Sequence, residues 1–285
     1  MQNNHFKNLS GLLLATFFIS TSGVLGKYIA MPSEVIVWFR SVFAMCFLYV
    51  FIKFKKIDLT LKSKKHIVPF VISGLFMAAH WITYFYALKL SNVAIGMLSL
   101  YTFPVMTALL EPLFLKVKFS LIHIFLGLLV LVGIYILAPE FTLGNTQVQG
   151  ILFGLFSALC YSFRILILKQ YVSQYNGTML MFYQTLIITI CLIPVLFFMD
   201  LSGFQSQFPY LILIALLTTA IGHTMMVHSF KHFSVSTASI ISSVQPIFGI
   251  ILAFVFLNEI PTRNTFIGGS LILATVIIES IRSKK

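Results

Sequence analysis

The chain has 285 residues, of which 59% are hydrophobic and 9% are charged, and its formal net charge is +12. Soluble globular domains carry about 25% charged residues, so this composition excludes a water-soluble domain and predicts a protein of the lipid bilayer. The positive charge does not indicate a nucleic-acid partner, because the lysines flank apolar runs, as they do in membrane proteins.

Apolar runs long enough to cross a bilayer follow one another along the chain. A spanning helix needs about 20 mostly apolar residues, and ten such runs are separated by charged residues or by breaks containing Pro, Gly or Asn. They cover residues 9–30, 34–52, 66–88, 92–115, 120–138, 149–171, 177–199, 207–230, 233–257 and 262–281. Strands of a membrane barrel would alternate apolar and polar residues. The sequence therefore predicts an all-α integral membrane protein with ten transmembrane helices.

The distribution of basic residues predicts the orientation of these helices. The first run is too long for a signal-peptide core, so we interpret it as a span, and ten spans place both termini on one side. If that side is the cytoplasm, fourteen of the 19 Lys and Arg residues lie in inner segments, and three, Lys27, Lys89 and Arg263, lie at outer ends. Arg40 and Arg164 lie within spans. Because cytoplasmic loops are rich in Lys and Arg, we expect cytoplasmic termini.

The two halves of the chain resemble each other. With residue 86 placed on residue 228, YALKLSNVAIGMLSLYTFP (86–104) falls on HSFKHFSVSTASIISSVQP (228–246) without a gap, and we call residues related by this offset equivalent. Residues 11–22 match 150–161, and WFR (38–40) falls roughly on FYQ (182–184). This order indicates an internal repeat of five spans. Five is odd, so the halves are expected to be inverted, as in many secondary transporters. The alternative is an old duplication without a transport role.

Spans four and nine carry Pro104 and Pro246 at equivalent positions. Proline removes a backbone hydrogen bond, so each helix is expected to bend or break there and to serve as a hinge. On span four, Tyr101, Pro104 and Glu111 share one face at 100° per residue. Glu111 either faces protein or water within the membrane or reaches the cytoplasmic interface, and the sequence favours neither.

Span three carries His80 and Tyr84 on one face, with Trp81 beside them. A histidine within a span is a functional-site hypothesis by default, and His80 and Glu111 are the candidates for handling protons. The aromatic neighbours could bind a flat or amphipathic solute. The structural alternative is a neutral histidine that is hydrogen-bonded to a neighbouring helix.

Later spans add further polar candidates. Arg164 on span six, beside Tyr161, could bind a carboxylate, pair with Glu111, or extend to the inner interface. Arg40 is expected to extend to the outer interface. His223 and His228 lie five residues apart, which separates them by about 140° on a helix and does not favour a joint metal site. The residues predicted to line a substrate cavity are His80, Trp81, Tyr84, Tyr101, Tyr161, Arg164, Ser243 and Gln245.

Several stretches resemble the drug/metabolite transporter superfamily in its EamA-type branch. They are WFRSVFA (38–44), YFYALKLSNVAIGMLSLYTFPVMTALLEPLFL (84–115), GLLVLVGIYIL (127–137), SFKHFSVSTASIISSVQPIFGIILAFVFLNE (229–259) and IGGSLILATVII (267–278). The resemblance covers nearly the whole chain, but its motifs are diffuse and identify the superfamily better than the substrate.

The resemblance implies two inverted five-helix repeats, residues 1–138 and 149–285, around a central cavity lined by spans 1, 3, 4, 6, 8 and 9. It also implies movement of small organic solutes such as amino acids, often outward, across a bacterial-type inner membrane. The family commonly has an acidic residue closing the fourth helix of each half. Glu259 fills that position in the second half, but the first half has Val117 there and Glu111 two turns earlier.

Three classes of function can be compared on the sequence. A secondary or facilitative transporter fits best, because no GxxxxGK[ST] nucleotide loop is present and no cofactor is implied. An intramembrane enzyme would need a motif such as HExxH or GxSxG, or paired membrane aspartates, but the two aspartates, Asp58 and Asp200, lie at loop edges. A metal-ion carrier would rest on scattered histidines and cysteines. The expected partners are therefore the bilayer and a small-molecule substrate, with protons as a coupling candidate.

Overall fold

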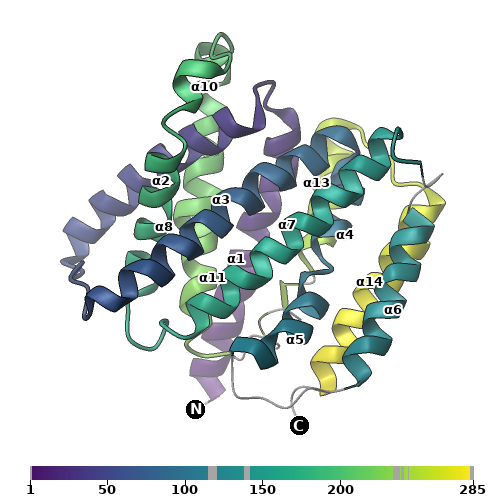
Figure 1. The fold of residues 1–285 in the computed structure, drawn as a ribbon, viewed down its shortest axis with the longest axis horizontal. Coiled ribbons are helices and arrows are strands. Elements are labelled where there is room, and N and C mark those ends of the chain that lie inside the picture. The colour runs from purple at the N-terminus through teal and green to yellow at the C-terminus, as the bar shows by residue number, and fades with distance from the viewer. Residues whose placement is uncertain are drawn as a thin grey trace.

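In the described part of the chain, every regular element is a helix (Figure 1). The computed structural model describes residues 2–114, 121–137, 142–233, 238, 241–242 and 244–282. The helices of the first half are α1 (Gln2–Tyr28), α2 (Ser33–Lys55), η1 (Lys64–His66), α3 (Ile67–Leu90), α4 (Val93–Leu100), α5 (Phe103–Phe114) and α6 (Ile122–Leu137). Those of the second half are α7 (Thr146–Lys169), α8 (Gly177–Cys191), α9 (Val195–Phe198), α10 (Phe204–Leu213), η2 (Ile214–His223), α11 (Thr224–Ser229), α13 (Gln245–Leu257) and α14 (Arg263–Arg282).

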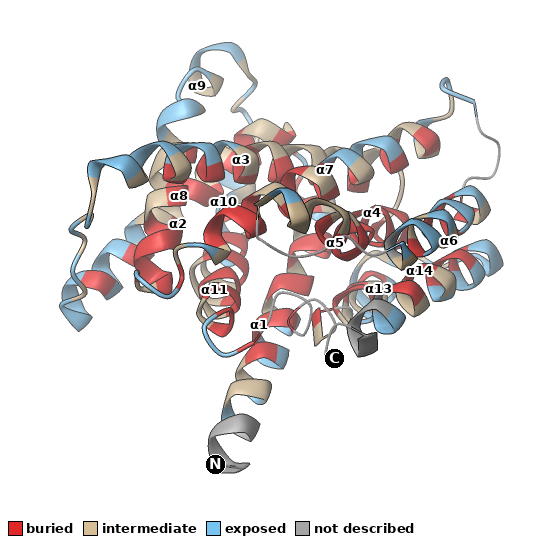
Figure 2. Cartoon of the chain, turned by 60° about the horizontal axis from the view of Figure 1, so that its bottom comes forward, coloured by how far each residue is buried: buried red, intermediate tan, exposed pale blue. Residues whose placement is uncertain are grey.

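Seven helical stretches in the described residues are long and apolar enough to cross a membrane. They are Lys7–Tyr28, Ser33–Lys55, Lys64–Leu90, Val93–Phe114, Thr146–Lys169, Gly177–Phe198 and Phe204–Ser229. Two shorter apolar helices cover Ile124–Leu137 and Gln245–Leu257. Buried residues gather at the centre, and helices such as α6 expose apolar side chains on the outside (Figure 2). The chain is thus an all-helical, multi-pass membrane protein, as predicted, although ten spans were expected and seven satisfy this criterion.

The principal helix pairs join the first half of the chain to the second. Helix α3 lies along α7, α6 lies along α14, and α2 packs on α8 (Figure 1). Helix α1 packs on both η2 and α13, and α7 in turn packs on α4 and α5. The core is therefore built from both halves together.

The helices that carry Pro104 and Pro246 begin next to these prolines. Helix α4 ends at Leu100 and α5 begins at Phe103, so the span Val93–Phe114 is interrupted directly before Pro104. Helix α13 begins at Gln245, which makes Pro246 its second residue. Proline is tolerated in the first turn because its missing N–H has no helical partner there. The break expected in span four is present, and a hinge movement at either proline stays a prediction.

Two lysines at equivalent positions bind the ends of neighbouring helices in the same way. Lys27, at the end of α1, donates from Nζ to three carbonyl oxygens at the end of α3 and just after it, and Lys169, at the end of α7, donates to two after α11. The acceptors are Leu88 (2.6 Å), Lys89 (3.2 Å) and Ser91 (2.8 Å) for Lys27, and Phe230 (3.0 Å) and Phe233 (3.3 Å) for Lys169. Leu88 is equivalent to Phe230, and Ser91 to Phe233. These bonds therefore indicate that the offset between residues 86 and 228 also holds in the first helix of each half. With this offset, residue 11 corresponds to residue 153, whereas the sequence match paired it with residue 150.

A second matched contact lies in the loops. Asp58 accepts hydrogen bonds from the backbone N–H and the hydroxyl of Thr60, at 2.8 and 2.6 Å. Asp200 accepts the same two kinds of bond from Ser202, at 2.9 and 3.0 Å. These are Asx turns, and they again lie at equivalent positions of the two halves.

Candidate substrate site

A small central cavity lies among helices of both halves. Its volume is about 20 Å³, which is room for roughly one water molecule. The lining residues are Ile19, Ser22, His80, Trp81, Tyr84, Leu100, Tyr101, Phe103, Tyr161, His223, Met226, Ser242 and Gln245. In this conformation the cavity is closed to an organic solute.

The lining residues correspond between the two halves of the chain. Ten of the thirteen form five pairs of equivalent positions. The pairs are Ile19 and Tyr161, Trp81 and His223, Tyr84 and Met226, Leu100 and Ser242, and Phe103 and Gln245. The rings of Trp81 and His223 contact each other, with centroids 5.6 Å apart. Equivalent positions of the repeat therefore meet at this cavity, although the side chains within each pair differ.

Most of the residues predicted to line a cavity are brought together here. Six of the eight lie in its wall, namely His80, Trp81, Tyr84, Tyr101, Tyr161 and Gln245. Ser243 lies outside the described residues. Arg164 stands behind the wall, with its guanidinium carbon 5.4 Å from the ring centre of Tyr161. The predicted set thus gathers at one place, while its role in binding stays a prediction.

His80 is hydrogen-bonded to a neighbouring helix. Its Nδ1 lies 2.7 Å from the hydroxyl of Ser157 on α7, and that hydroxyl also contacts the His80 carbonyl at 2.9 Å. The ring packs on Tyr161 at 4.6 Å between centroids. This geometry matches the structural alternative for His80, which its place in the cavity wall does not exclude. Glu111 lies half-buried on α5, and a proton-handling role for either residue stays a prediction.

A hydrogen bond connects the turn between α4 and α5 to the start of α13. The Tyr101 hydroxyl donates to Gln245 Oε1 at 2.8 Å. Tyr101 follows the last residue of α4, and Gln245 is the first residue of α13. This bond therefore joins the chain just before Pro104 to the chain just before Pro246, so a movement at either proline would change the cavity.

Arg40 does not reach the outer interface, and that expectation was wrong. The side chain is fully buried, and its guanidinium carbon stacks 3.9 Å from the ring centre of Trp81. Its Nε donates to the Thr219 hydroxyl at 2.6 Å and its Nη1 to Ser22 at 3.4 Å. Because Ser22 and Trp81 line the cavity, Arg40 stands directly behind the wall. Its position near one end of the span suggested exposure, but packing of α2 against η2 and α3 encloses it.

Arg164 is also fully buried, so it does not extend to the inner interface. Its Nε and Nη2 donate to Gln184 Oε1 on α8, at 3.2 and 2.9 Å. Gln184 donates in turn to the hydroxyl of Ser73 on α3. The arginine is thus held by α8 and lies beside Tyr161, which lines the cavity.

Several buried polar atoms around the cavity have no hydrogen-bond partner among the described residues. They are Nη2 of Arg40, Nη1 of Arg164, Nε1 of Trp81, the hydroxyl of Tyr84 and Nδ1 of His223. Four of these five atoms are hydrogen-bond donors, and the histidine nitrogen can be one. Buried polar groups in proteins are normally paired, so this concentration of free donors marks the cavity as a place for acceptor groups.

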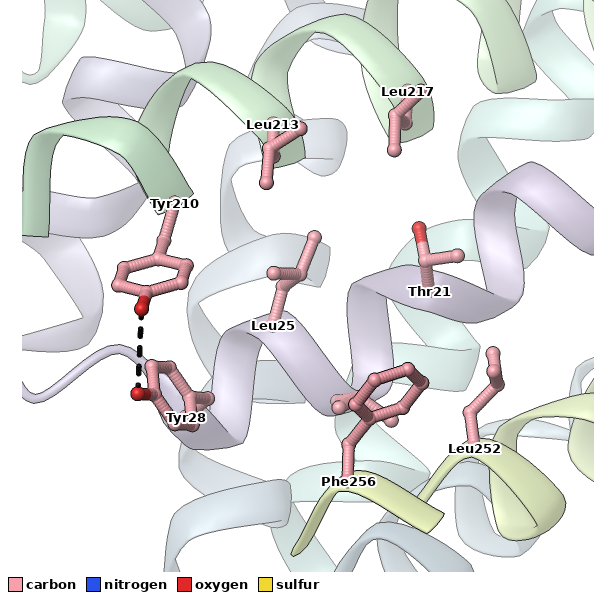
Figure 3. A pocket seen from close by; sticks show the side chains of 9 residues that line it. Thr21, Leu25, Tyr28, Tyr210, Leu213, Leu217, Leu252 and Phe256 are labelled. Carbon is pink, nitrogen blue, oxygen red and sulfur yellow. Dashed lines mark hydrogen bonds between the residues drawn. The ribbon is translucent and has the colours of Figure 1, made fainter.

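A second, larger pocket opens between α1, α10, η2 and α13 (Figure 3). Its volume is about 410 Å³. Its lining is apolar apart from the hydroxyls of Thr21, Tyr28 and Tyr210, and the last two lie 3.4 Å apart at one end. Its described lining contains no charged side chain, so this lateral pocket offers a charged metabolite no ionic partner.

The family match spans nearly the whole chain and counts each half separately. The EamA-like transporter family matches residues 7–138 and again residues 148–281. The chain belongs to the EamA-like transporter family. It is therefore a membrane transporter and not an enzyme, as predicted.

Named relatives of this EamA-like transporter agree with that assignment. The chain is similar to the pseudopaline exporter CntI of Pseudomonas aeruginosa, with 23% identity over 282 residues that cover 97% of both chains. It is 26% identical over 199 residues to an uncharacterized transporter of Archaeoglobus fulgidus, covering 69% of this chain and 70% of the other. A protein of known crystal structure shares the fold, with a TM-score of 0.70, 17% identity and 98% of each chain covered.

Proposed function

We propose that this EamA-like protein is a secondary or facilitative transporter that exports a small organic metabolite, such as an amino acid or a related compound, by alternating access. Ten helices would form two inverted five-helix repeats, residues 1–138 and 149–285, with both termini in the cytoplasm of a bacterial-type inner membrane. The observation that carries the proposal is the central cavity, whose wall pairs equivalent residues of the two halves. Inverted repeats with a site between them are typical of secondary transporters.

The matched contacts of Lys27 and Lys169, and of Asp58 and Asp200, support the repeat independently of the cavity. The closed cavity supports alternating access, because a transporter must pass through a state in which its site is sealed. The outward direction is supported by the similarity to a protein named as an exporter. Among the described residues, no group of three or more His, Cys, Asp or Glu side chains could hold a metal ion, so the alternative of a metal-ion carrier has no candidate site there.

A transport assay tests the proposal directly. Inside-out vesicles from cells that produce the protein would be given a ¹³C-labelled metabolite extract, and their contents analysed by mass spectrometry. We expect at least one organic solute to accumulate above the level in vesicles without the protein. Gln245→Leu removes a cavity side chain and should reduce this accumulation. Leu252→Ala, on the same helix but in the lateral pocket, is the matched control. Equal contents with and without the protein would contradict transport.

The same vesicles can show whether protons are exchanged. An imposed pH gradient should change the accumulation in a proton-coupled exchanger and leave it unchanged in a downhill carrier. If protons are coupled, His80→Gln or Glu111→Gln should remove the response to the gradient.

Cysteine labelling tests the orientation. The proposed topology places Lys62, before α3, in the cytoplasm, and Asn145, before α7, outside. Single cysteines at these positions, in a background without the three native cysteines, should react oppositely with an impermeant reagent in intact cells. External labelling of Lys62→Cys would overturn the topology.

A further inference from the structure

The two arginines beside the central cavity carry charge without an acidic hydrogen-bond partner among the described residues. Arg40 and Arg164 are both 0% exposed. Their hydrogen bonds go to neutral groups: the hydroxyls of Thr219 and Ser22, the amide oxygen of Gln184 and the sulfur of Met181. Burying an ion costs several kcal/mol unless an opposite charge compensates for it, and intramembrane arginines usually pair or mark a ligand path.

Most of the described carboxylates accept hydrogen bonds from residues other than the two arginines. Of the seven acidic residues, four accept hydrogen bonds away from the arginines. Glu34 accepts from the Tyr86 hydroxyl, Asp58 from Thr60, Asp200 from Ser202 and Glu259 from the Val93 N–H. None of these four carboxylates hydrogen-bonds to either arginine in this conformation.

The two guanidinium groups contact different residues of the cavity wall. Arg40 stacks on Trp81 and contacts Ser22, whereas Arg164 lies beyond Tyr161 and is held from α8. Each keeps one nitrogen without a partner in the described residues. A guanidinium group forms strong, charge-assisted hydrogen bonds with carboxylates, and each arginine has one free nitrogen that can donate to a carboxylate once the wall opens.

We infer that the solute is a small organic dianion with two carboxylates, one bound by Arg40 and the other by Arg164. This inference rests on the proposed transport function and names the substrate class of the same cavity. The Trp81 and Tyr161 rings, which contact the arginines and line the cavity, would pack on the carbon skeleton between the carboxylates. The free Trp81 N–H and Tyr84 hydroxyl add donors for the same acceptors. A neutral or cationic solute would leave two buried positive charges uncompensated.

The competing explanation is that each arginine only connects helices. The two explanations predict opposite effects on stability. If the arginines are structural, replacing either with glutamine should lower the unfolding temperature of the ligand-free protein. If they await an anionic ligand, the replacement removes an uncompensated buried charge, and the ligand-free protein should be as stable as before or more stable.

Binding can be measured without transport. The detergent-purified full chain would be heated with malonate, succinate, glutarate or adipate, and with matched compounds in which one or both carboxylates are replaced by carboxamides. A ligand that binds the folded state raises the unfolding temperature. We expect at least one dicarboxylate to raise it, its monoamide to bind about ten- to a hundredfold more weakly, and its diamide to have no effect.

The arginine variants complete the test. Arg40→Gln and Arg164→Gln should each reduce dicarboxylate affinity about ten- to a hundredfold without lowering ligand-free stability. Arg263→Gln, which removes an exposed charge, should change neither property. The inference is overturned if no dicarboxylate raises the unfolding temperature, if the diamide acts equally, or if both variants lose stability and keep the response.

The outcomes separate this inference from the proposed function. Dicarboxylate binding without any solute accumulation in vesicles would support the site and contradict transport. Accumulation of a neutral or cationic solute that is unchanged in both arginine variants would support transport and contradict the dianion.

Discussion

Lys27 and Lys169 bind the ends of α3 and α11 in the same way, whereas Trp81 and His223, which are also equivalent, face each other as different side chains. The same contrast holds for the other matched contacts. The lysines at helix ends and the aspartates in the loops keep their residue type between the halves, and the paired positions in the cavity wall do not. The two halves therefore share a frame, by which we mean the lysine and aspartate contacts at helix ends and loops. They supply different side chains to the cavity wall.

The arginines show how this division arises. In the first half, Arg40 on α2 donates to Ser22 on α1, and in the second half Arg164 on α7 donates to Gln184 on α8. Ser22 and Arg164 are equivalent, and Arg40 falls on Gln184 where WFR is matched with FYQ. The same two helices are connected in each half, but the arginine lies on the opposite member of the pair. Positive charge thus reaches the cavity wall from non-equivalent positions of the two halves.

The largest effect is expected at a pair of equivalent positions where one half has a large side chain and the other has glycine. Gly154 on α7 lies where an added Cβ atom would meet the Ser99 Cβ of α4 at 2.5 Å. The first half has Leu12 at the equivalent position, where the full side chain is buried. Giving position 154 the same residue, Gly154→Leu, should therefore prevent close packing of α7 on α4 and remove most folded protein, because the obstructing atom is next to the backbone and cannot rotate away.

Size-exclusion chromatography in detergent measures the folded fraction of Gly154→Leu. Phe156→Leu, which changes a 51% exposed side chain of the same helix, is the control and should remain folded. A monodisperse Gly154→Leu protein with unchanged unfolding temperature would contradict the expectation.

A smaller, matched loss is expected at the lysines. Lys27→Met and Lys169→Met keep the apolar stem but remove the ammonium hydrogen bonds to partly buried carbonyl oxygens, which costs about 1–3 kcal/mol. Among the described residues, Lys27 makes three such bonds and Lys169 makes two, so Lys27→Met should lower the unfolding temperature more. Lys231→Met, at an exposed position, should have little effect. If only one of the two matched lysines contributes to stability, their contacts are not equivalent.

The frame was accessible from the sequence because it depends on patterns that repeat. Apolar runs predicted the helices, and the match between the halves predicted that Pro104 and Pro246 occupy equivalent positions, which prove to be helix starts. Helical phasing also gathered six residues that line the cavity. The sequence pattern bears on His223 only as a possible metal ligand and does not predict its place in the cavity wall. His223 ends η2, a π-helix, where hydrogen bonds span five residues rather than four and phasing at 100° per residue fails.

Arg40 was misplaced for a different reason. Whether an arginine near the end of a span extends to the interface or turns inward depends on which helices enclose it. Here the decisive partners, Trp81 on α3 and Thr219 on η2, are far apart in the sequence. No local pattern around residues 38–44 indicates them.

The prolines should affect movement more than stability. Pro104→Ala and Pro246→Ala restore a backbone N–H at helix starts, so little folded protein should be lost. If both prolines are hinges, each variant should slow transport, and the two should favour opposite open states, because their helices run in opposite directions in the proposed arrangement. Distances between spin labels placed across the cytoplasmic end and across the outer end of the helix bundle would measure which state is open. Shifts in the same direction, or no shifts, would mean that the prolines are static.

The smallest effect is expected at the matched aspartates. Hydrogen bonds from the Thr60 hydroxyl and backbone lower the pKa of Asp58, and those from the Ser202 backbone and hydroxyl lower the pKa of Asp200. A carboxyl whose pKa is lower in the folded state stabilises the fold above its unfolded pKa, and this contribution is lost as the pH falls through the folded value. The loss should therefore occur below about pH 4.

Asparagine at either position keeps an acceptor for the turn but removes the charge. Asp58→Asn and Asp200→Asn should lower the unfolding temperature slightly, and by similar amounts, at pH 7, because both side chains are solvent-exposed and screened. The difference from the native protein should shrink as the pH falls below about 4. Thermal unfolding between pH 3 and pH 7 would measure it. A difference in unfolding temperature that does not vary with pH would mean that the turn depends on side-chain shape rather than on charge. A difference at only one of the two aspartates would mean that the two loops are not equivalent in stability.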